Sequence, residues 1–333
     1  MTCRRFGLPM IRFAGVPNCR ETANNDRRAP LDNLRFPPLI DLQIRMASTI
    51  EDRQGGMLRA RKRFGQHFLK DPAVIERIID EIDPRAGEHI VEIGPGRGAL
   101  TRPLLASGCT LHAIEIDRDL AAALQRRLGE AIEAPDPSGK KGCAPVDGRF
   151  FLHLADALEF DFTALAPPPL RIVGNLPYNI STPILFKLLA SLPSIEDMHL
   201  MLQKEVVERL TALPGSKAWG RLGLMLQIDC EPESLFTVES DAFTPAPKVE
   251  SSVVRLTPHP RPRLDPETKE CLEAIAKACF SKRRKMLRNA LGGICDAQTI
   301  RNAGIDPKAR PEMLSVDDFA ALARVVFDTN PGL

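Results

Sequence analysis

Apolar residues recur along this chain with two different periods, and the two periods alternate from residue 89 onward. Short apolar runs rich in Val, Ile, Leu and Phe, typical of buried strands, cover residues 89–96, 110–117, 150–156, 170–176 and 197–204. Helical spacing separates the first three runs, at residues 98–107 and 118–132. Strands that alternate with helices indicate a parallel sheet covered on both faces. The expected fold class is therefore α/β.

The pattern changes in the second half of the chain. Strands are predicted over residues 221–238 and 251–258, joined by FTPAPKVE, whose prolines impose an extended connection. After a Pro-rich stretch, helical spacing dominates, with helices expected over residues 266–293 and 315–327. We expect three regions: a disordered leader or misassigned start at residues 1–56, a sheet domain at 57–258, and a small helical domain at 264–330.

Two segments fall outside this regular pattern. The leader is Arg-rich and interrupted by Pro, but acids such as Glu21 and Asp26 argue against an organelle transit peptide, and Met57 is an alternative start. Residues 133–149, EAPDPSGKKGCAPVDGR, are rich in Gly, Pro and charge. This composition predicts a long surface loop.

Composition narrows the class of protein. The 333 residues are 44% hydrophobic, enough for a sizeable core, and no apolar run approaches the roughly 20 residues of a membrane span. Lys and Arg number 45 against 43 Asp and Glu, so any contact with nucleic acid would depend on local clusters. The eight cysteines form no C-x-x-C pair and no zinc-like Cys/His cluster. We expect reduced, mostly buried thiols, no metal, a cytoplasmic location and, by default, a monomer.

The sequence VEIGPGRGALT places three glycines between a predicted strand and a helix. Gly94, Gly96 and Gly98 allow the backbone to turn tightly and approach a ligand. Glu115 ends the next strand, 21 residues after Gly94, where a carboxylate in a doubly wound sheet accepts hydrogen bonds from ribose hydroxyls. The G-x-G-x-G spacing favours S-adenosylmethionine, which has no phosphate, over a dinucleotide. The alternative to a cofactor site is a glycine turn that only lets a helix pack on a strand.

Two further segments end strands at the same edge of the sheet. Asp156 would accept a hydrogen bond from the adenine amine of a cofactor, or else cap a helix. GNLPYNIST contains Asn175, whose side-chain oxygen would hold a target adenine amine so that its lone pair faces an incoming methyl group. Pro177 fixes the backbone and supplies no competing donor. Tyr178, the chain's single tyrosine, offers a flat face for an extruded base, although a buried tyrosine at a strand end is the simpler reading.

Basic residues gather in two places. Arg61, Lys62 and Arg63 precede the sheet domain, and a second cluster lies on the predicted helix at residues 266–293. Beside an adenine pocket, such clusters are what binding to an RNA backbone requires, whereas either one alone is more often a solvated face. The second cluster consists of Lys282, Arg283, Arg284, Lys285 and Arg288.

Eight pieces of the chain resemble a known family, in that family's order. They are RFGQHFL, VEIGPGRGALT, AIEID, ADAL, GNLPYNISTPIL, QKEVVERL, FTPAPKVESSVVRL and FSKRRKMLRNAL. The sequence resembles the ribosomal RNA adenine N6,N6-dimethyltransferases, the KsgA-type dimethyladenosine transferases, from about Arg61 to about Phe327. The resemblance implies a Class I (Rossmann-like) methyltransferase domain with a small all-helical C-terminal domain, and S-adenosylmethionine as cofactor. It also implies that two adjacent adenosines near the 3′ end of small-subunit rRNA are each methylated twice, within a pre-assembled 30S-type particle.

The resemblance also implies roles for particular residues. Leu176, Pro177 and Tyr178 would form the target-base site. Met286 and Ala290 replace the Thr and Asn that the family more often has, so we expect no polar contact from those two positions. The positions that would contact S-adenosylmethionine or align the amine are His67, Leu69, Gly94, with Gly96 in the same turn, Glu115, Asp156 and Asn175.

Three alternative functions share part of this pattern. Large-subunit rRNA adenine methyltransferases have the glycine turn and an N-[LI]-P-Y-N motif, but GNLPYNISTP with FSKRRKMLRN favours the small-subunit branch. DNA adenine methyltransferases usually show D-P-P-Y or N-P-P-Y and a separate target-recognition domain. Some relatives bind nucleic acid without needing catalysis, as transcription factors or assembly checkpoints. The intact segment 175–178 and glycine turn favour an enzyme.

Overall fold

A computed structural model describes residues 60–61, 65–128, 149–165 and 168–330, all within one compact unit, Pro38–Leu333. The predicted leader and most of the predicted loop at residues 133–149 lie outside the described residues. The division into domains near residues 258–264 stays a prediction.

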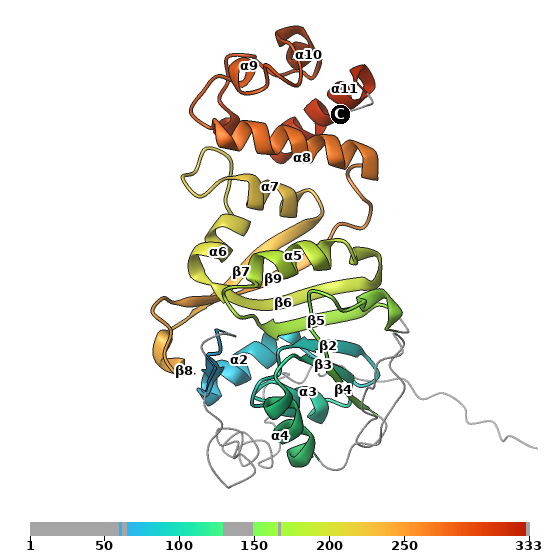
Figure 1. Cartoon of the computed structure of the whole chain (residues 1–333), viewed down its shortest axis with the longest axis vertical. Helices are drawn as coiled ribbons and strands as arrows, with labels where there is room; N and C mark the ends of the chain where they lie inside the picture. The colour runs from blue at the N-terminus through green and yellow to red at the C-terminus, as the bar shows by residue number, and fades with distance from the viewer. Residues whose placement is uncertain (1–59, 62–64, 129–148, 166–167, 331–333) are drawn as a thin grey trace, which may run out of the picture. The chain divides into compact units, whose positions relative to one another are not determined.

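The described part is organised around a seven-stranded sheet (Figure 1). Its first five strands are parallel, whereas β9 is antiparallel to both of its neighbours. The prediction of an α/β fold with a parallel sheet is confirmed, with an antiparallel pair at one edge. In order across the sheet, the strands are β4 (Phe150–Leu154), β3 (Thr110–Glu115), β2 (His89–Ile93), β5 (Leu170–Asn175), β6 (Ile195–Gln203), β9 (Ser251–Pro258) and β7 (Cys230–Val238).

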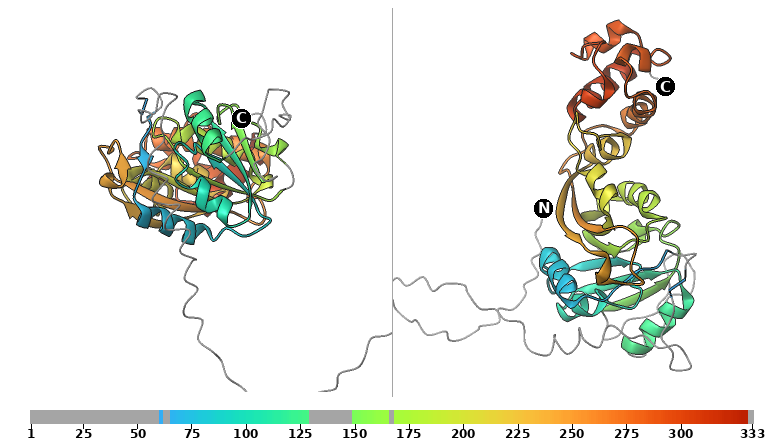
Figure 2. Two further views of the ribbon diagram at one scale, coloured as in Figure 1. Left: turned by 90° about the horizontal axis from the view of Figure 1, so that it is seen from below. Right: turned by 90° about the vertical axis from the view of Figure 1, so that its left-hand side faces the viewer.

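Helices cover both faces of this sheet (Figures 1 and 2). Successive strand residues point to opposite faces, so Ile90 belongs to one apolar core and Val91 to the other. The Ile90 core contains side chains of α2 (Pro72–Ile82), α3 (Thr101–Ala106) and α4 (Arg118–Leu128). The Val91 core contains side chains of α5 (Ser181–Leu189), α6 (Lys204–Leu210) and α7 (Arg221–Gln227).

The strand predicted over residues 221–238 is wrong in its first half, because residues 221–227 form α7. Leu222 and Leu226, one helical turn apart, pack into the core of the sheet. Leu224 and Met225, between them, pack into a third core together with the C-terminal helices. A helix buried on two sides loses its polar face, so its sequence shows no helical period.

The C-terminal part is helical, as predicted. Its helices are α8 (Pro266–Ser281), α9 (Leu287–Ala290), α10 (Ala297–Asn302) and α11 (Val316–Thr329). Asp265 caps α8 by accepting from the Thr268 backbone N–H, and a capping box of Ser315 and Asp318 begins α11. The helix predicted over residues 315–327 is therefore confirmed.

The continuous helix predicted over residues 266–293 is wrong, because α8 ends at Ser281 and residues 282–286 form a turn. The Arg283 side chain bonds across to Glu312 and to the carbonyls of Ser216 and Lys217. Immediately after the turn, Leu287 is fully buried. Tertiary contacts thus override a strong local helical pattern.

A two-stranded ribbon lies outside the main sheet. In it, β1 (Phe68–Leu69) pairs antiparallel with β8 (Phe243–Thr244). This pairing brings the QHFL segment, far away in the sequence, beside the β8–β9 connection. Short 3-10 helices complete the fold: η2 (Phe162–Ala164), η3 (Leu192–Ser194), η4 (Ser240–Ala242) and η5 (Pro311–Met313).

The cysteines in the described ranges are all free thiols, as predicted. Cys109, Cys230, Cys271 and Cys279 are buried, and Cys295 is half-buried. Burial raises the pKa of the Cys230 and Cys279 thiols to about 12. None of the helices in the described part of the chain has the length and apolar character that crossing a membrane requires.

The substitution Gly223→Ala should destabilise the protein by about 2 kcal/mol or more. A Cβ at this position would lie 2.4 Å from the Arg209 carbonyl oxygen, so α6 and α7 would have to move apart. This cost exceeds the gain of about 1 kcal/mol in helix propensity. Urea unfolding measures the effect. The matched control is Gly293→Ala, since a Cβ there meets nothing within 4 Å; equal unfolding midpoints for the two variants would contradict the prediction.

Candidate active site

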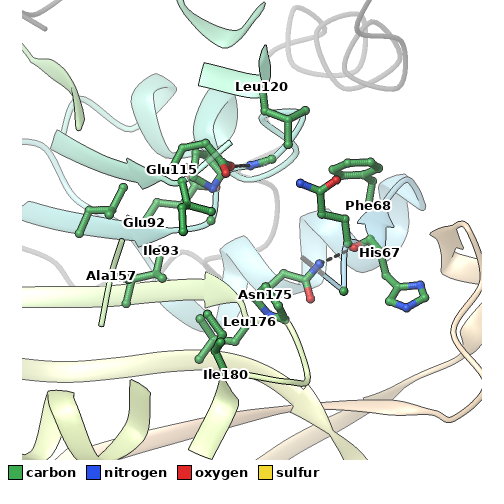
Figure 3. A pocket seen from close by; sticks show the side chains of 18 of the residues that line it. His67, Phe68, Glu92, Ile93, Glu115, Leu120, Ala157, Asn175, Leu176 and Ile180 are labelled. Atoms are coloured by element: carbon green, nitrogen blue, oxygen red, sulfur yellow. Dashed lines mark hydrogen bonds between the residues drawn. The ribbon is translucent and has the colours of Figure 1, made fainter. Parts of the chain in front are cut away.

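A cavity lies at the carboxyl ends of β2, β3, β4 and β5 (Figure 3). It contains about 1150 Å³ of space free of protein atoms, including the part open to solvent. The structure brings together at this cavity every residue predicted for the cofactor and the target base. These are His67, Leu69, Gly94, Gly96, Glu115, Asp156, Asn175, Leu176, Pro177 and Tyr178.

The glycine turn forms one wall of the cavity. Gly94, Gly96 and Gly98 all have left-handed backbone conformations, with φ of 70°, 55° and 79°. A side chain would be strained at any of the three positions. At Gly98 a Cβ would also lie 2.8 Å from Leu124, so this glycine serves the packing of α4. Gly94 and Gly96 line the cavity, where their lack of a side chain exposes the backbone to a ligand.

Glu115 lies at the end of β3 with 5% of its surface exposed. The backbone N–H groups of Gly96 and Asp117 donate to its two carboxylate oxygens, at 3.1 and 2.9 Å. These bonds fix the carboxylate against the glycine turn. Burial raises the pKa of Glu115 to about 7, although the two backbone bonds act in the opposite direction.

Glu92, one residue before the end of β2, also lines the cavity and was not singled out from the sequence. It is 2% exposed, and the Thr101 hydroxyl donates to its Oε2 at 2.6 Å. Burial raises the pKa of Glu92 to about 8, and the neighbouring charge of Glu115 adds to the shift. A charged residue inside the apolar run HIVEI, directly before the glycine turn, is the signal that would have identified it.

Asn175 ends β5 and faces the cavity (Figure 3). Its side-chain nitrogen donates to the His67 carbonyl oxygen at 2.9 Å. This bond orients the amide and leaves Oδ1 as the acceptor. A Cβ on Gly174 would lie 2.8 Å from the Ile93 carbonyl oxygen, so this glycine lets β5 run close beside β2.

Tyr178 is held from two sides. Its hydroxyl lies 2.9 Å from the Ser251 hydroxyl, and its ring stacks on the His67 ring, with centroids 5.6 Å apart and an angle of 26°. His67 Nδ1 donates to the Pro245 carbonyl oxygen at 2.7 Å. The His67 side chain therefore supports the tyrosine, and its backbone carbonyl orients Asn175.

Asp156 and Leu69 complete the set of predicted positions. Asp156 follows β4, and its Oδ1 accepts from the Leu158 backbone N–H at 2.9 Å, so it caps a local turn while also lining the cavity. Leu69 is 7% exposed and packs into the Ile90 core. It thus anchors β1 at the edge of the cavity.

Acidic side chains outnumber basic ones around the cavity. Glu92, Glu115 and Asp156 line it, and Arg97 is the sole lysine or arginine among the described lining residues. The Arg97 guanidinium lies 4.4 Å from the centre of the Phe68 ring. Such a cavity suits a cationic ligand better than a pyrophosphate. Within the described ranges, no group of three or more His, Cys, Asp or Glu side chains could hold a metal ion.

Neither Arg61 nor any residue of the second predicted basic cluster belongs to the lining of this cavity. Arg61 pairs with Asp117 at 3.0 Å and also with Asp119, which ties its guanidinium to the start of α4. Lys62 and Arg63 lie outside the described residues. Arg283 is half-buried and paired, as described above. The other members of the second cluster, Lys282, Arg284, Lys285 and Arg288, are exposed.

Comparison with known sequences gives one consistent result. The family described as "Ribosomal RNA adenine dimethylase" matches residues 57–327. "Ribosomal RNA small subunit methyltransferase A" of Nitrosococcus oceani is 52% identical over 269 residues, which are 80% of this chain and 96% of that protein. The protein of the same name from Pseudomonas aeruginosa is 49% identical, over 80% of this chain and 94% of its own length.

Two solved structures align with most of this chain. The 23S rRNA methyltransferase ErmE aligns with a TM-score of 0.59 and 25% identity, over 78% of this chain and 99% of its own. A dimethyladenosine transferase from Plasmodium falciparum aligns with a TM-score of 0.63 and 24% identity, over 79% of this chain and 98% of its own. The latter similarity establishes the fold.

The substitution Glu92→Gln should make the free energy of unfolding depend less on pH. The Glu92 pKa lies above its usual value of 4.5, so the folded protein keeps a proton that the unfolded chain has released. Wild-type stability therefore falls as the pH rises from about 4.5 to about 8. Glutamine carries no such proton and can still accept from Thr101. Relative to wild type, the variant should gain about 3 kcal/mol between about pH 5 and about pH 8.5.

Urea unfolding of both proteins across this pH range tests the prediction. Glu231→Gln, which removes an exposed carboxylate from β7, controls for the general loss of a negative charge. A stability difference between Glu92→Gln and wild type that stays constant with pH would show that the carboxyl titrates normally in the folded protein.

Proposed function

Because the chain belongs to the ribosomal RNA adenine dimethylase family, we propose that it methylates small-subunit rRNA with S-adenosylmethionine as methyl donor. The targets are the N6 amines of two adjacent adenosines near the RNA 3′ end, and the product is N6,N6-dimethyladenosine. The reaction belongs to small-subunit biogenesis in the cytoplasm, on a 30S-type particle, with the enzyme acting as a monomer. Relatives about 50% identical over most of this chain, named for small-subunit rRNA, support that substrate over large-subunit rRNA.

The oriented amide of Asn175 carries the chemical part of the proposal. An adenine amine is a poor nucleophile because its lone pair is delocalised into the ring. With its nitrogen bonded to the His67 carbonyl, Asn175 has Oδ1 available to accept an N–H of that amine. This hydrogen bond would hold the N–H of the amine in one direction, so that the lone pair on the nitrogen points toward the methyl donor.

The described cavity fits the chemical groups of S-adenosylmethionine. Glu115 has lone pairs for ribose hydroxyls, and Asp156 has an oxygen for the adenine amine. Ile116 and Ala157 supply apolar surface for an adenine ring. Glu92 adds a second buried carboxylate on the side of the glycine turn, where a cationic group is favoured.

When bound, S-adenosylmethionine supplies a methyl group on a positively charged sulfur, which is already a good leaving group. The target nitrogen bonds to the methyl carbon as the carbon–sulfur bond breaks, and the electron pair stays on sulfur. The nitrogen would then release a proton to solvent water, which returns it to neutral charge. Asn175 and the rigid strand end contribute alignment, so no strong base is required.

Tyr178 would hold the target base by stacking. His67 covers one face of its ring, so the other face is the one offered to an adenine. The hydrogen bond to Ser251 fixes the plane of the ring before the base arrives. Extruding a base from a helix costs a few kcal/mol, and an aromatic platform recovers part of that cost.

The first test measures methyl transfer from labelled S-adenosylmethionine to small subunits from a strain that lacks the modification. Wild type should place label in dimethyladenosine near the RNA 3′ end. Asn175→Ala should lower the rate about 100-fold or more. Label on large subunits or DNA instead would assign a different substrate, and RNA binding with no label anywhere would indicate a binding factor.

Two substitutions of Tyr178 separate the ring from the hydroxyl. Tyr178→Phe keeps the stacking surface and loses only the bond to Ser251, so its rate should stay within about 10-fold of wild type. Tyr178→Ala removes the surface and should cost about 1–3 kcal/mol of stacking, a 10- to 100-fold loss or more. The same labelled-methyl assay measures both. Equal losses for the two variants would argue against stacking as the role of this residue.

A further inference from the structure

Glu92 is a buried carboxyl group whose contacts within the chain do not require an acid. It is 2% exposed, and the Thr101 hydroxyl donates to its Oε2 at 2.6 Å. A glutamine oxygen would accept the same bond without the cost of burying an ionisable group. The bond to Thr101 therefore accounts for a polar residue at this position, but not for a carboxyl group.

Glu115 lies close enough to Glu92 for the two charges to interact, and both side chains lie on the same side of the cavity (Figure 3). The backbone N–H groups of Gly96 and Asp117 donate to Glu115, so its ionised form has two fixed donors. Glu92 has only the Thr101 hydroxyl. Because like charges at close range oppose double ionisation, Glu115 ionises first and Glu92 holds the proton when no ligand is bound.

The surroundings of Glu92 favour its neutral form. The charge that acts on its pKa is that of Glu115, which raises it further above the value set by burial. The neighbouring elements α3 and β5 contribute the neutral side chains of Thr101 and Asn175. A positive charge that ionises Glu92 would therefore come from a ligand. The other titratable or charged groups around this part of the site are Arg97, Asp117 with its partner Arg61, Asp156 and His67.

The methyl donor and its product differ in charge at one atom. S-adenosylmethionine has a positively charged sulfur, whereas the sulfur of S-adenosylhomocysteine is a neutral thioether. The adenosine, amine and carboxylate groups are common to both, so hydrogen bonds to those groups cannot distinguish the two. A poorly solvated carboxylate can distinguish them, because its interaction with a positive charge is stronger than it would be in water.

We propose that Glu92 is a specificity-determining residue that selects the methyl donor over its product, because it gives up its proton only when a sulfonium is bound. The proposal rests on the proposed function, since it takes S-adenosylmethionine as the cofactor. The Glu92 proton passes to solvent as the donor binds. After methyl transfer the sulfur keeps the electron pair of the broken bond and is neutral. The Glu92 carboxylate then lacks a countercharge and takes up a proton from solvent, which favours release of the product.

Isothermal titration calorimetry of the full-length protein tests the proton release. Titrations in phosphate and in Tris, whose ionisation enthalpies differ, give the number of protons exchanged on binding. At about pH 7.5, wild type should release about half a proton more with S-adenosylmethionine than with S-adenosylhomocysteine. Sinefungin, in which a protonated amine replaces the methylated sulfur, should resemble S-adenosylmethionine, because the charge itself is recognised.

Glu92→Gln should remove the difference between the two ligands. Glutamine can still accept from Thr101 but cannot ionise. The affinity for S-adenosylmethionine should fall about 10-fold, while that for S-adenosylhomocysteine should stay within about 3-fold of wild type. In wild type, the ratio of the two affinities should also rise with pH up to about 8, as ionisation of Glu92 becomes easier. In the variant the ratio should stay constant over the same range.

Asp156→Asn is the matched control inside the cavity. It also removes a carboxylate from the lining, but one that we assign to the adenine amine, a group that both ligands share. This variant should lower the two affinities by similar factors and leave their ratio close to that of wild type. Unfolding midpoints and S-adenosylhomocysteine binding, measured for both variants, identify any general loss of structure.

Three outcomes would overturn the inference. The first is equal proton release by wild type with S-adenosylmethionine and S-adenosylhomocysteine, a comparison that needs no variant. The second is a parallel loss of both affinities in Glu92→Gln, which would place Glu92 against a group common to the two ligands. The third is an unchanged affinity of that variant for S-adenosylmethionine. If wild type binds neither ligand, the proposed function itself fails, and this outcome is distinct from failure of the charge selection.

Discussion

The hydrogen bond between the Asn175 side chain and the His67 carbonyl is the constraint on which the cavity depends. His67 lies in a segment outside the seven-stranded sheet, and the β1–β8 ribbon fixes that segment with only two residues per strand. The His67 ring in turn donates to Pro245 and supports Tyr178. The amide, the tyrosine and the β8–β9 connection therefore cannot move independently. A shift of any one leaves a directional polar group without its partner, which costs about 1–3 kcal/mol.

The buried carboxylates impose a second constraint, which destabilises the fold instead of holding it together. Glu92 and Glu115 lie at one end of the sheet, and burial raises the pKa of both into the neutral range. Two such groups destabilise the ligand-free fold near neutral pH. A carboxyl group that is ionised in the unfolded chain must, on folding, either take up a proton or keep its charge where water solvates it poorly. A cationic ligand in the cavity would offset this cost by interacting with the ionised forms. The cost to the empty protein and the preference for a cation thus have the same electrostatic origin.

Local sequence predicted those parts of the site that depend on short-range backbone geometry. The glycine turn, Glu115 at the next strand end and the segment 174–178 follow from strand periodicity and from residues with restricted or permissive backbones. The sequence did not reveal Glu92, because a single acid in an apolar strand has no motif of its own. It also misassigned residues 221–227, since α7 is buried on two sides and its apolar residues serve two cores. The break after Ser281 depends on Arg283 bonding to residues more than 60 positions away in the sequence. Such errors arise where tertiary contacts decide the conformation.

Two arginines of the predicted basic clusters make a related point. Arg61 and Arg283 were both predicted from local charge density to bind RNA, yet each is engaged with carboxylates or backbone carbonyls of its own chain. The five donors of a guanidinium serve phosphate and carboxylate equally well, so sequence alone cannot assign the partner. Lysine has no planar fork and is less suited to joining three acceptors, so the exposed lysines of a cluster are better candidates for direct phosphate contact. Simultaneous replacement of the whole basic turn would therefore combine two effects, the loss of RNA contacts and the release of the α6–α7 loop, and would overstate the number of phosphates that the turn itself contacts.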